Sequence, residues 1–412
     1  MEWIKKHCNF IIVISIIIVI VSFMLIIYFY KRGSFTPEEE VKDKGFYYNL
    51  IEEVNRETEE NVNYLISPLS VGNVLSVLRD GASGVTYDEL NNALKSQTFI
   101  KNINVNDKIS IANALFINNA FKDLISNSYI DKIENNYNSD AIFDDMQNPD
   151  VINNWVDDKT YGMIPNLVDE ISNDFVMGIV NAIALDVNWK ESFNCNFTKD
   201  EDFTKVDGNN IEVSMMYEPD RDGDLSYIES DKAVGIIKPY ATYDGVDLEY
   251  VAILPNDNVF DYVNQFDENE FKTLMDSEVS SSSSIHIDLS LPKYSYDYNM
   301  AKFKTVLSHL GLNSMFDVNL ADFSLMTGGV STLFVEDAIH KTKIELNEMG
   351  TKAAAATYVS LDLKTIESPE YYKTISVTFN KPFVYLIKEK DSNDIIFFGV
   401  VYAPESEDNT CS

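Results

Sequence analysis

One stretch near the C-terminus constrains the fold more than any other part of the chain: Glu345–Thr365, ELNEMGTKAAAATYVSLDLKT. From Thr351 on, every second residue is small or apolar, whereas the intervening residues include Lys352 and Asp362. This alternation is typical of a strand with one buried and one solvated face. Four consecutive alanines nevertheless favour a helix over a strand. The pattern therefore predicts a segment that can join a sheet without always belonging to it, behind a permissive Gly350.

The composition excludes several classes of function. With 45% hydrophobic residues and no Pro/Gly/Ser linker, the chain has material for one large core. Its formal net charge of −34 would repel a phosphate backbone, so we expect no nucleic-acid partner. No phosphate-binding glycine loop, nucleophile elbow or clear catalytic triad is present, and we expect no enzyme activity and no cofactor. The cysteines are far apart and indicate neither a metal site nor a disulfide framework: Cys8, Cys195 and Cys411.

The N-terminus predicts a membrane anchor. Ile11–Tyr30 is an uncharged apolar run of 20 residues that ends in aromatic and basic residues and lacks a small-residue cleavage site. We interpret residues 1–33 as a signal-anchor, with a cleaved signal peptide as the alternative, residues 34–44 as a tether and residues 45–407 as the folded domain. Lysines flank the span on both sides and leave its orientation open. The glycosylation sequon at Asn196 favours a lumenal or extracellular domain.

The order of the predicted elements indicates an α+β domain. Start signals for helices occur at Thr36–Pro37 and Ser67–Pro68, and Thr86–Glu89 has the sequence of a capping box for a third helix. Helical spacing returns at Met300–Leu310. The clearest strands are predicted at Val180–Trp189, Ala233–Pro239, Leu248–Leu254, Ile285–Leu291, Ile375–Ile387 and Ile395–Val401.

The chain resembles the serpins. EMGTKAAAAT, from Glu348 to Thr357, is similar to the hinge of the serpin reactive loop, although Met349 and Lys352 replace glutamates of the usual pattern. By the period-two count, Lys352 lies on the solvent face. Further matches run in order over roughly residues 45 to 405: Ser67–Ser70, Gly81–Thr86 with Glu89–Leu90, Ile152–Val156, Asn181 with Trp189, Leu291–Lys293, His340, Phe379–Phe383, Gly399 and Pro404.

The resemblance implies a serpin fold: a large central mixed β-sheet, two further sheets, eight or nine helices and an exposed reactive-centre loop. In serpins a protease cuts this loop, which then inserts as a new strand into the central sheet and carries the trapped protease with it. The residues that would turn inward here are all small, so the hinge is predicted to be inhibitory. Its members are Glu348, Gly350, Thr351, Ala353, Ala354, Ala355, Ala356 and Thr357. We expect the domain to be a monomer.

The resemblance also assigns two groups of residues that control insertion. Ser67, Ser70, Asn181 and His340 would form a hydrogen-bonded cluster under the strands that part, although a lone buried histidine is more often a satisfied core residue. Trp189, Lys293 and Glu348 would lie at the point where insertion begins.

Specificity depends on the bond that is cut. Counting from Glu348 in the family's register places this bond at Lys364–Thr365, which suits a serine protease of the trypsin class. The return to the Phe379 motif is longer than usual and leaves Asp362, Leu363 or Tyr371 as alternatives. Asp362 would imply a caspase-like or granzyme-like target, and inhibition of a caspase-like or other cysteine protease is therefore an alternative function. A non-inhibitory serpin that acts as a membrane-associated binding protein is the main alternative. The abundance of Ile, Asn, Asp and Tyr suggests an AT-rich genome, such as that of a poxvirus.

Overall fold

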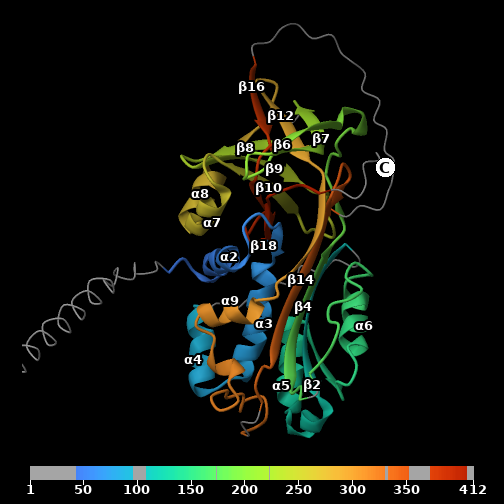
Figure 1. Ribbon diagram of the computed structural model, residues 1–412, viewed down its shortest axis with the longest axis vertical. Coiled ribbons are helices and arrows are strands. Elements are labelled where there is room, and N and C mark those ends of the chain that lie inside the picture. The colour runs from blue at the N-terminus through green and yellow to red at the C-terminus, as the bar shows by residue number, and fades with distance from the viewer. Residues whose placement is uncertain are drawn as a thin grey trace, which may run out of the picture. The chain divides into compact units, whose positions relative to one another are not determined.

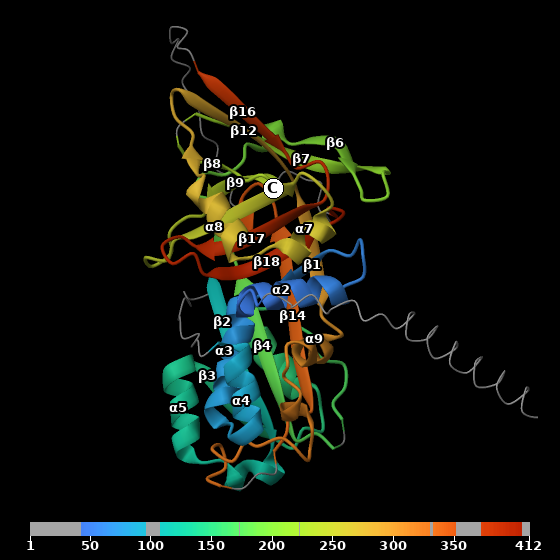
Figure 2. The ribbon, with the colours of Figure 1, turned by 90° about the vertical axis from the view of Figure 1, so that its left-hand side faces the viewer.

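The computed structural model describes residues 43–95, 108–172, 174–221, 223–329, 333–351 and 372–405. These residues form three β-sheets, eight α-helices and three short 3-10 helices. Figure 1 shows the central sheet with α6 (Asp150–Lys159) on one face and α3 (Pro68–Gly81) on the other, and Figure 2 shows the same layers from the side. Strand residues alternate between the two faces. β2 and β4 are buried on both faces, whereas every second residue of β14, from Asp337 to Glu345, is exposed or half-buried.

The central sheet is mixed. β2 and β3 are parallel, β2 and β4 antiparallel, β4 and β14 parallel, and β13 and β14 antiparallel. Two very short strands extend its upper part, where β15 lies between β14 and β5. Its members are β2 (Ile109–Asn118), β3 (Ser139–Asp144), β4 (Met177–Leu185), β5 (Val187–Asn188), β13 (Tyr294–Asn299), β14 (Asp337–Leu346) and β15 (Gly350–Thr351).

Two further sheets complete the β structure. The second sheet has seven strands: β1 (Tyr64–Ile66), β18 (Ile395–Val401), β17 (Phe383–Glu389), β10 (Leu248–Pro255), β9 (Ala233–Pro239), β8 (Ser226–Glu229) and β11 (Val279–Ser280). The third sheet has four: β16 (Lys373–Thr378), β12 (Ile285–Pro292), β7 (Asn210–Asp220) and β6 (Lys199–Thr204). The strands predicted at Ala233, Leu248, Ile285 and Ile395 begin at those residues.

The helices divide the apolar interior into two cores. A small core lies between α6 and small residues of the sheet, Ala114, Ala182 and Ala184. The larger core contains α2, α3 and the second sheet. The helices are α2 (Phe46–Glu57), α3 (Pro68–Gly81), α4 (Gly84–Ala93), α5 (Asn127–Tyr137), α6 (Asp150–Lys159), α7 (Val259–Gln265), α8 (Glu268–Asp276) and α9 (Phe303–His309), with 3-10 turns η1 (Asn119–Leu124), η2 (Cys195–Phe197) and η3 (Ser314–Phe316).

Of the three predicted helix starts, one is confirmed, one is wrong and one lies outside the described residues. Ser67 caps α3, because its hydroxyl accepts a hydrogen bond from the Ser70 N–H as a helix start requires. α2 begins only at Phe46, because Gly45 has φ 87°, outside the helical region, and the start predicted at Thr36 lies outside the described residues. The capping box at Thr86 is wrong: α4 begins at Gly84, so Thr86 lies inside the helix.

Thr86 and Glu89 hold α4 to a distant loop instead of capping it. The Thr86 hydroxyl accepts a hydrogen bond from the Asp322 N–H and lies 3.1 Å from the hydroxyl of Ser314. The Glu89 carboxylate accepts from the Asn313 N–H and from both the N–H and the hydroxyl of Ser314. Thr86 and Glu89, whose side chains are typical of a helix cap, therefore form long-range hydrogen bonds to the loop that contains Ser314 and Asp322.

Two predicted strands are divided in the structure. Val180–Trp189 breaks after Leu185, and only Val187–Asn188 resumes as β5. The predicted strand Ile375–Ile387 separates into β16 of the third sheet and β17 of the second sheet. Pro382 lies in the break, where it cannot donate to a sheet ladder, and the Lys381 ammonium group holds the turn by donating to the Pro255 carbonyl at 2.8 Å.

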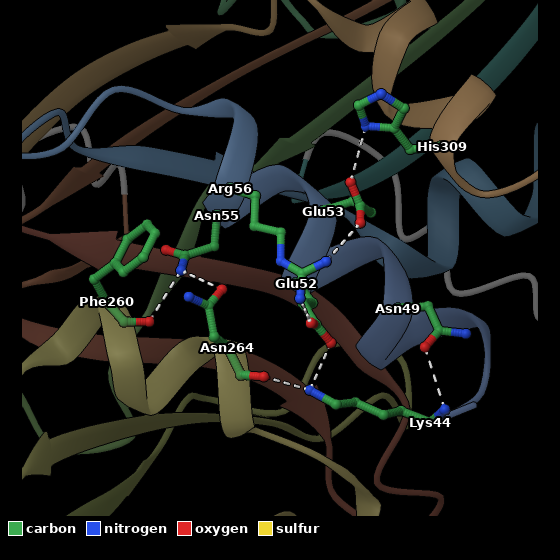
Figure 3. Close-up of polar contacts among 9 residues, drawn as sticks. All are labelled: Lys44, Asn49, Glu52, Glu53, Asn55, Arg56, Phe260, Asn264 and His309. Carbon is green, nitrogen blue, oxygen red and sulfur yellow. Dashed lines mark hydrogen bonds and ion pairs between the residues drawn. The ribbon is translucent and has the colours of Figure 1, made fainter. Parts of the chain in front are cut away.

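A polar network anchors α2 to its neighbours (Figure 3). The Lys44 ammonium group pairs with Glu52 at 2.7 Å and donates to the carbonyl of Asn264 in α7. Asn55 donates to the Asn264 side chain, and Glu53 contacts the imidazole of His309 at 3.1 Å. α2 is thereby fixed to both α7 and α9 at the start of the folded unit.

No helix in the described ranges is long and apolar enough to cross a membrane, and the predicted anchor Ile11–Tyr30 lies outside those ranges. Within the same ranges no group of three or more His, Cys, Asp or Glu could hold a metal ion. Cys195 is disulfide-bonded, which the spacing of the cysteines did not predict.

The contact between α4 and the loop at Ser314 can be tested with a matched pair of variants. Replacing Glu89 by Ala leaves two backbone N–H groups and a hydroxyl without their acceptor, and we expect it to lower the free energy of unfolding by about 2 kcal/mol. The control Asp88→Ala, on the exposed side of the same helix, should change it by less than about 0.5 kcal/mol. Urea unfolding of both variants measures the difference, and equal losses would contradict the assignment.

Candidate functional site

The central feature is a short pairing between two parallel strands, which we call the seam. β4 and β14 pair over four positions only, from Gly178 opposite Asp337 to Asn181 opposite His340. Above these positions the described residues show no further pairing between the two strands. Gly350–Thr351 then occupies the space between β14 and β5, antiparallel to both. The upper half of the sheet is therefore already separated by the first two residues of another strand.

The four residues predicted to lie under the sheet come together at the top of the seam. The Ser67 N–H donates to Nε2 of His340 at 3.3 Å, and the Asn181 amide donates to the Ser70 hydroxyl. All four side chains are buried. Because Asn181 and His340 are the last pair of the seam, both project towards α3 at the position where the strands begin to separate.

Sequence reasoning missed two members of this cluster. Asn113 of β2 accepts a hydrogen bond from the Asn181 amide at 2.7 Å, so the cluster extends across three neighbouring strands. The Thr342 hydroxyl donates to the Leu65 carbonyl at 2.8 Å and ties β14 to β1. The signal for Asn113 was present, since it is a polar residue in the otherwise apolar run Ile111–Ile117.

His340 is held in its neutral form. Its burial lowers the pKa to about 4, and Nε2 accepts the Ser67 N–H, which places the proton of the neutral ring on Nδ1. Within the part of the chain that the structure describes, Nδ1 has no hydrogen-bond partner. Protonation of Nε2 would bring its N–H donor against the N–H donor of Ser67, and it would place an unpaired positive charge in the core. The closed seam therefore requires an uncharged His340.

The second predicted cluster also assembles. The Lys293 ammonium group pairs with Glu348 at 3.1 Å, and both side chains are at most 5% exposed. Trp189 binds the turn twice, because its indole N–H donates to the Asn347 carbonyl and its backbone N–H to the Met349 carbonyl. The Thr198 hydroxyl, which sequence reasoning missed, donates to Glu348 at 2.8 Å. These contacts fix the turn that joins β14 to β15.

The described part of the hinge fits its slot closely. A Cβ atom on Gly350 would lie 2.1 Å from the Val187 carbonyl oxygen, so only glycine allows the backbone to approach β5. Thr351 is buried, and its hydroxyl lies 2.6 Å from the hydroxyl of Tyr240, another residue that sequence reasoning missed. Tyr240 stacks on Trp189 with 4.5 Å between ring centroids, which links the hinge to the cluster below it.

The other predicted residues of the loop lie outside the described ranges: Ala353, Ala354, Ala355, Ala356, Thr357, Lys364 and Thr365. Asn196 is exposed in η2, with its amide donating to the Asn194 side chain at 3.1 Å.

Comparison with known proteins identifies the family. The model of the family "Serpin (serine protease inhibitor)" matches residues 42–404. The chain belongs to the serpin family. Human neuroserpin is 27% identical over 414 residues, which cover 93% of this chain and 95% of that protein. An uncharacterized serpin-like protein of Methanosarcina acetivorans is 27% identical over 387 residues, covering 89% of this chain and 86% of that protein.

A solved structure agrees with this assignment. The thermophilic serpin tengpin in its native state matches with a TM-score of 0.74 and 28% identity, over 89% of this chain and 94% of that chain. The predicted serpin fold, with three sheets in an α+β arrangement, is therefore confirmed. Neither neuroserpin nor the Methanosarcina protein is viral, so the comparisons give no support to the poxviral source suggested by composition.

The buried ion pair of this serpin can be tested by a double-mutant cycle. The variant Lys293→Met leaves Glu348 buried without its cation. We expect it to lower the free energy of unfolding by about 3–5 kcal/mol. Replacing both partners, as in Lys293→Met with Glu348→Leu, should recover most of this loss. Urea denaturation of the two single variants and the double variant measures the coupling, and additive effects would contradict it.

The His340 environment predicts a loss of stability in acid. The ordinary pKa of 6.5 applies to the unfolded chain and about 4 to the folded one, so the unfolded state binds the proton first. Stability is therefore fully present above pH 6.5 and falls by ~3 kcal/mol as the pH drops through 4. His340→Gln keeps an acceptor for Ser67 without titrating, and should remove this part of the slope. Unfolding across pH 4–7 measures it. The control His309→Gln, at an exposed imidazole, should keep the slope.

Proposed function

We propose that this serpin is a suicide inhibitor of a trypsin-like serine protease. A protease cuts the exposed loop, the hinge inserts between β4 and β14, and the acylated protease is carried along before it can be released. The observation that supports this proposal most directly is the position of Gly350–Thr351, which already form a strand antiparallel to β14 and β5 in line with the seam. A longer strand that continued from Thr351 would run between β14 and β4.

The seam is short, so separating β4 from β14 during loop insertion breaks few hydrogen bonds. Only four residue pairs join β4 to β14 at the closed end, and Thr351 is the first residue of the alternating stretch whose inward side chains are small. Insertion exchanges this short pairing for two new ladders along a full strand, so every backbone donor and acceptor of the new strand gains a partner. The inward side chains must be small because that face of the sheet packs against the larger core.

The hinge can be tested with Thr351→Arg. The Thr351 side chain is 3% exposed and faces Tyr240, so a guanidinium group there should block insertion and turn the inhibitor into a substrate. The matched control Lys352→Glu changes a charge that the period-two count of the sequence predicts to lie on the solvent face, and it should preserve inhibition. Incubating full-length variants with trypsin-like proteases, followed by denaturing gels, measures the covalent complex. A wild-type chain that is only cut, with no complex, would overturn the proposal.

We propose Lys364–Thr365 as the bond that is cut, since a lysine enters the carboxylate-bearing pocket of a trypsin-like protease. Replacing Lys364 by Ala should lower the rate of complex formation by ~10²-fold or more, because the pocket carboxylate loses its cation. Mass spectrometry of the released C-terminal fragment identifies the bond directly. Cleavage after Asp362 would instead favour a caspase-like target.

Thermal unfolding before and after cleavage separates inhibition from the alternative of a non-inhibitory, membrane-associated binding protein. An inserted loop adds a strand and should raise the melting temperature strongly, whereas a loop that stays outside should not.

We also propose that Ile11–Tyr30 anchors the chain in a membrane with the serpin domain on the lumenal or extracellular side. The exposed position of Asn196 is consistent with glycosylation there, and a shift in gel mobility after glycosidase treatment tests it.

A further inference from the structure

A cavity lies beside the seam, on the face of the central sheet that α6 covers. Its volume is about 200 Å³, and its walls come from both strands of the seam: Gly178 and Val180 from β4, and Asp337 and Ile339 from β14. α6 contributes Ile152 to the lining. We call it the seam cavity. Its two strand walls are the same residues that pair with each other across the seam.

The interior of the seam cavity is apolar. Phe116, Ile152, Val168 and Phe175 face it, all of them members of the small core under α6 or packed against that core. An apolar cavity of ~150 Å³ in a protein is large enough to bind benzene. The seam cavity therefore has room for one aromatic ring with a short aliphatic arm.

The rim of the seam cavity is acidic. Three carboxylates line it, those of Glu170, Glu336 and Asp337. Glu336 accepts the Val176 N–H at 3.2 Å and Asp337 accepts the Ala338 N–H at 2.8 Å, and each carboxylate retains further acceptor positions. The Lys304 ammonium group donates to the Glu336 carbonyl at 3.3 Å, which leaves three negative charges against one positive charge.

The charge on Asp337 is poorly compensated. Desolvation raises the pKa of its carboxyl group, and neighbouring Glu336 raises it further, whereas the Ala338 N–H and Lys304 act in the opposite direction. A cation bound at this rim would relieve the like-charge repulsion between neighbouring carboxylates. The rim thus favours a cationic group next to an apolar chamber.

We propose that the seam cavity binds a small arylalkylammonium ion, with its aromatic ring among the apolar side chains and its ammonium group at Glu170, Glu336 and Asp337. The ring displaces water from apolar surface, and the ammonium group donates charge-assisted hydrogen bonds to the carboxylates. Neutral and anionic ligands of the same shape lack the second interaction.

Binding would act on the seam, and this consequence depends on the proposed function. Because β4 and β14 supply opposite walls, a strand inserted between them would separate the walls and dismantle the site. A ligand that binds only the closed form stabilises that form in proportion to ligand concentration. The bound arylalkylammonium ion would therefore slow loop insertion and shift the outcome of cleavage from a trapped protease to a released one.

The test uses 2-phenylethylammonium as the probe and isothermal titration calorimetry of the full-length chain. We expect saturable one-to-one binding, about tenfold weaker binding of the neutral analogue 2-phenylethanol, and no binding of phenylacetate. The absence of saturable binding at millimolar probe, or equal affinity for the ammonium and the alcohol, would overturn the proposal.

Charge variants test the rim with a matched control. Glu170→Gln and Asp337→Asn should each weaken binding of 2-phenylethylammonium several-fold, while Asp169→Asn, an exposed neighbour that does not line the cavity, should leave it unchanged. Equal effects of all three variants would mean that the rim does not recognise the cation, and would contradict the proposal.

A filled cavity gives an independent test. Val168→Phe adds bulk to the lining without removing the backbone bonds of residue 168 to Asn153. We expect this variant to lose binding while keeping the circular dichroism spectrum of the parent. Binding that survives in the folded variant would place the probe elsewhere and overturn the site. If Val168→Phe does not fold, the charge variants alone decide.

Titration of the cleaved chain separates this proposal from the proposed function. If the loop inserts, the cleaved chain should no longer bind 2-phenylethylammonium, and the probe should reduce the yield of covalent complex. If the cleaved chain keeps both its melting temperature and its affinity for the probe, the cavity is confirmed as a site while insertion is refuted. If a cleaved chain with a raised melting temperature still binds equally well, the coupling to the seam is refuted.

Discussion

The four residue pairs between β4 and β14 are the contact on which the rest of the site depends. Parallel neighbours normally pair along most of their length, but here the pairing ends at Asn181 and His340. Beneath this last pair, a buried cluster pairs Ser67, Ser70, Asn113, Asn181 and His340 through hydrogen bonds, although the Asn181 amide oxygen and His340 Nδ1 have no partner within the described residues. Above it, β15 already lies between β14 and β5. The sheet is thus closed at one end and prepared for a new strand at the other.

The two ends of this arrangement are held by different interactions. The closed end depends on neutral hydrogen bonds around His340, whose charge must be absent. The open end depends on charge, through the buried pair of Lys293 and Glu348, and on aromatic packing of Trp189 against Tyr240. Protonation of His340 would weaken the closed end, whereas loss of the Lys293 or Glu348 charge would weaken the open end. The two ends can therefore be destabilised separately. The seam cavity adds a third point of contact with both strands.

Local sequence rules succeeded where one segment determines its own conformation. Ser67 caps α3 as its side-chain type predicts, and Ala233–Pro239 is a strand with the predicted bounds. They failed where the partner is distant. Thr86 and Glu89 have the spacing of a capping box, yet they bind the loop at Ser314 because tertiary contacts satisfy the same donors and acceptors. The predicted strand from Ile375 is divided because its halves pair with strands of different sheets.

The sequence alone determined the alternating small residues of the hinge, the helix and strand types and the order of motifs, because each is a property of residues a few positions apart. The tertiary structure alone decided that residues 178–181 and 337–340, roughly 160 positions apart, are neighbours. It also decided that Gly350 packs on Val187 and that three carboxylates line the rim of an apolar cavity. Asn113 became part of the cluster at His340, and Tyr240 part of the cluster at Trp189, only through tertiary contacts. Periodicity reports which face of a strand is buried, but the identity of the neighbouring strand depends on how the whole chain packs.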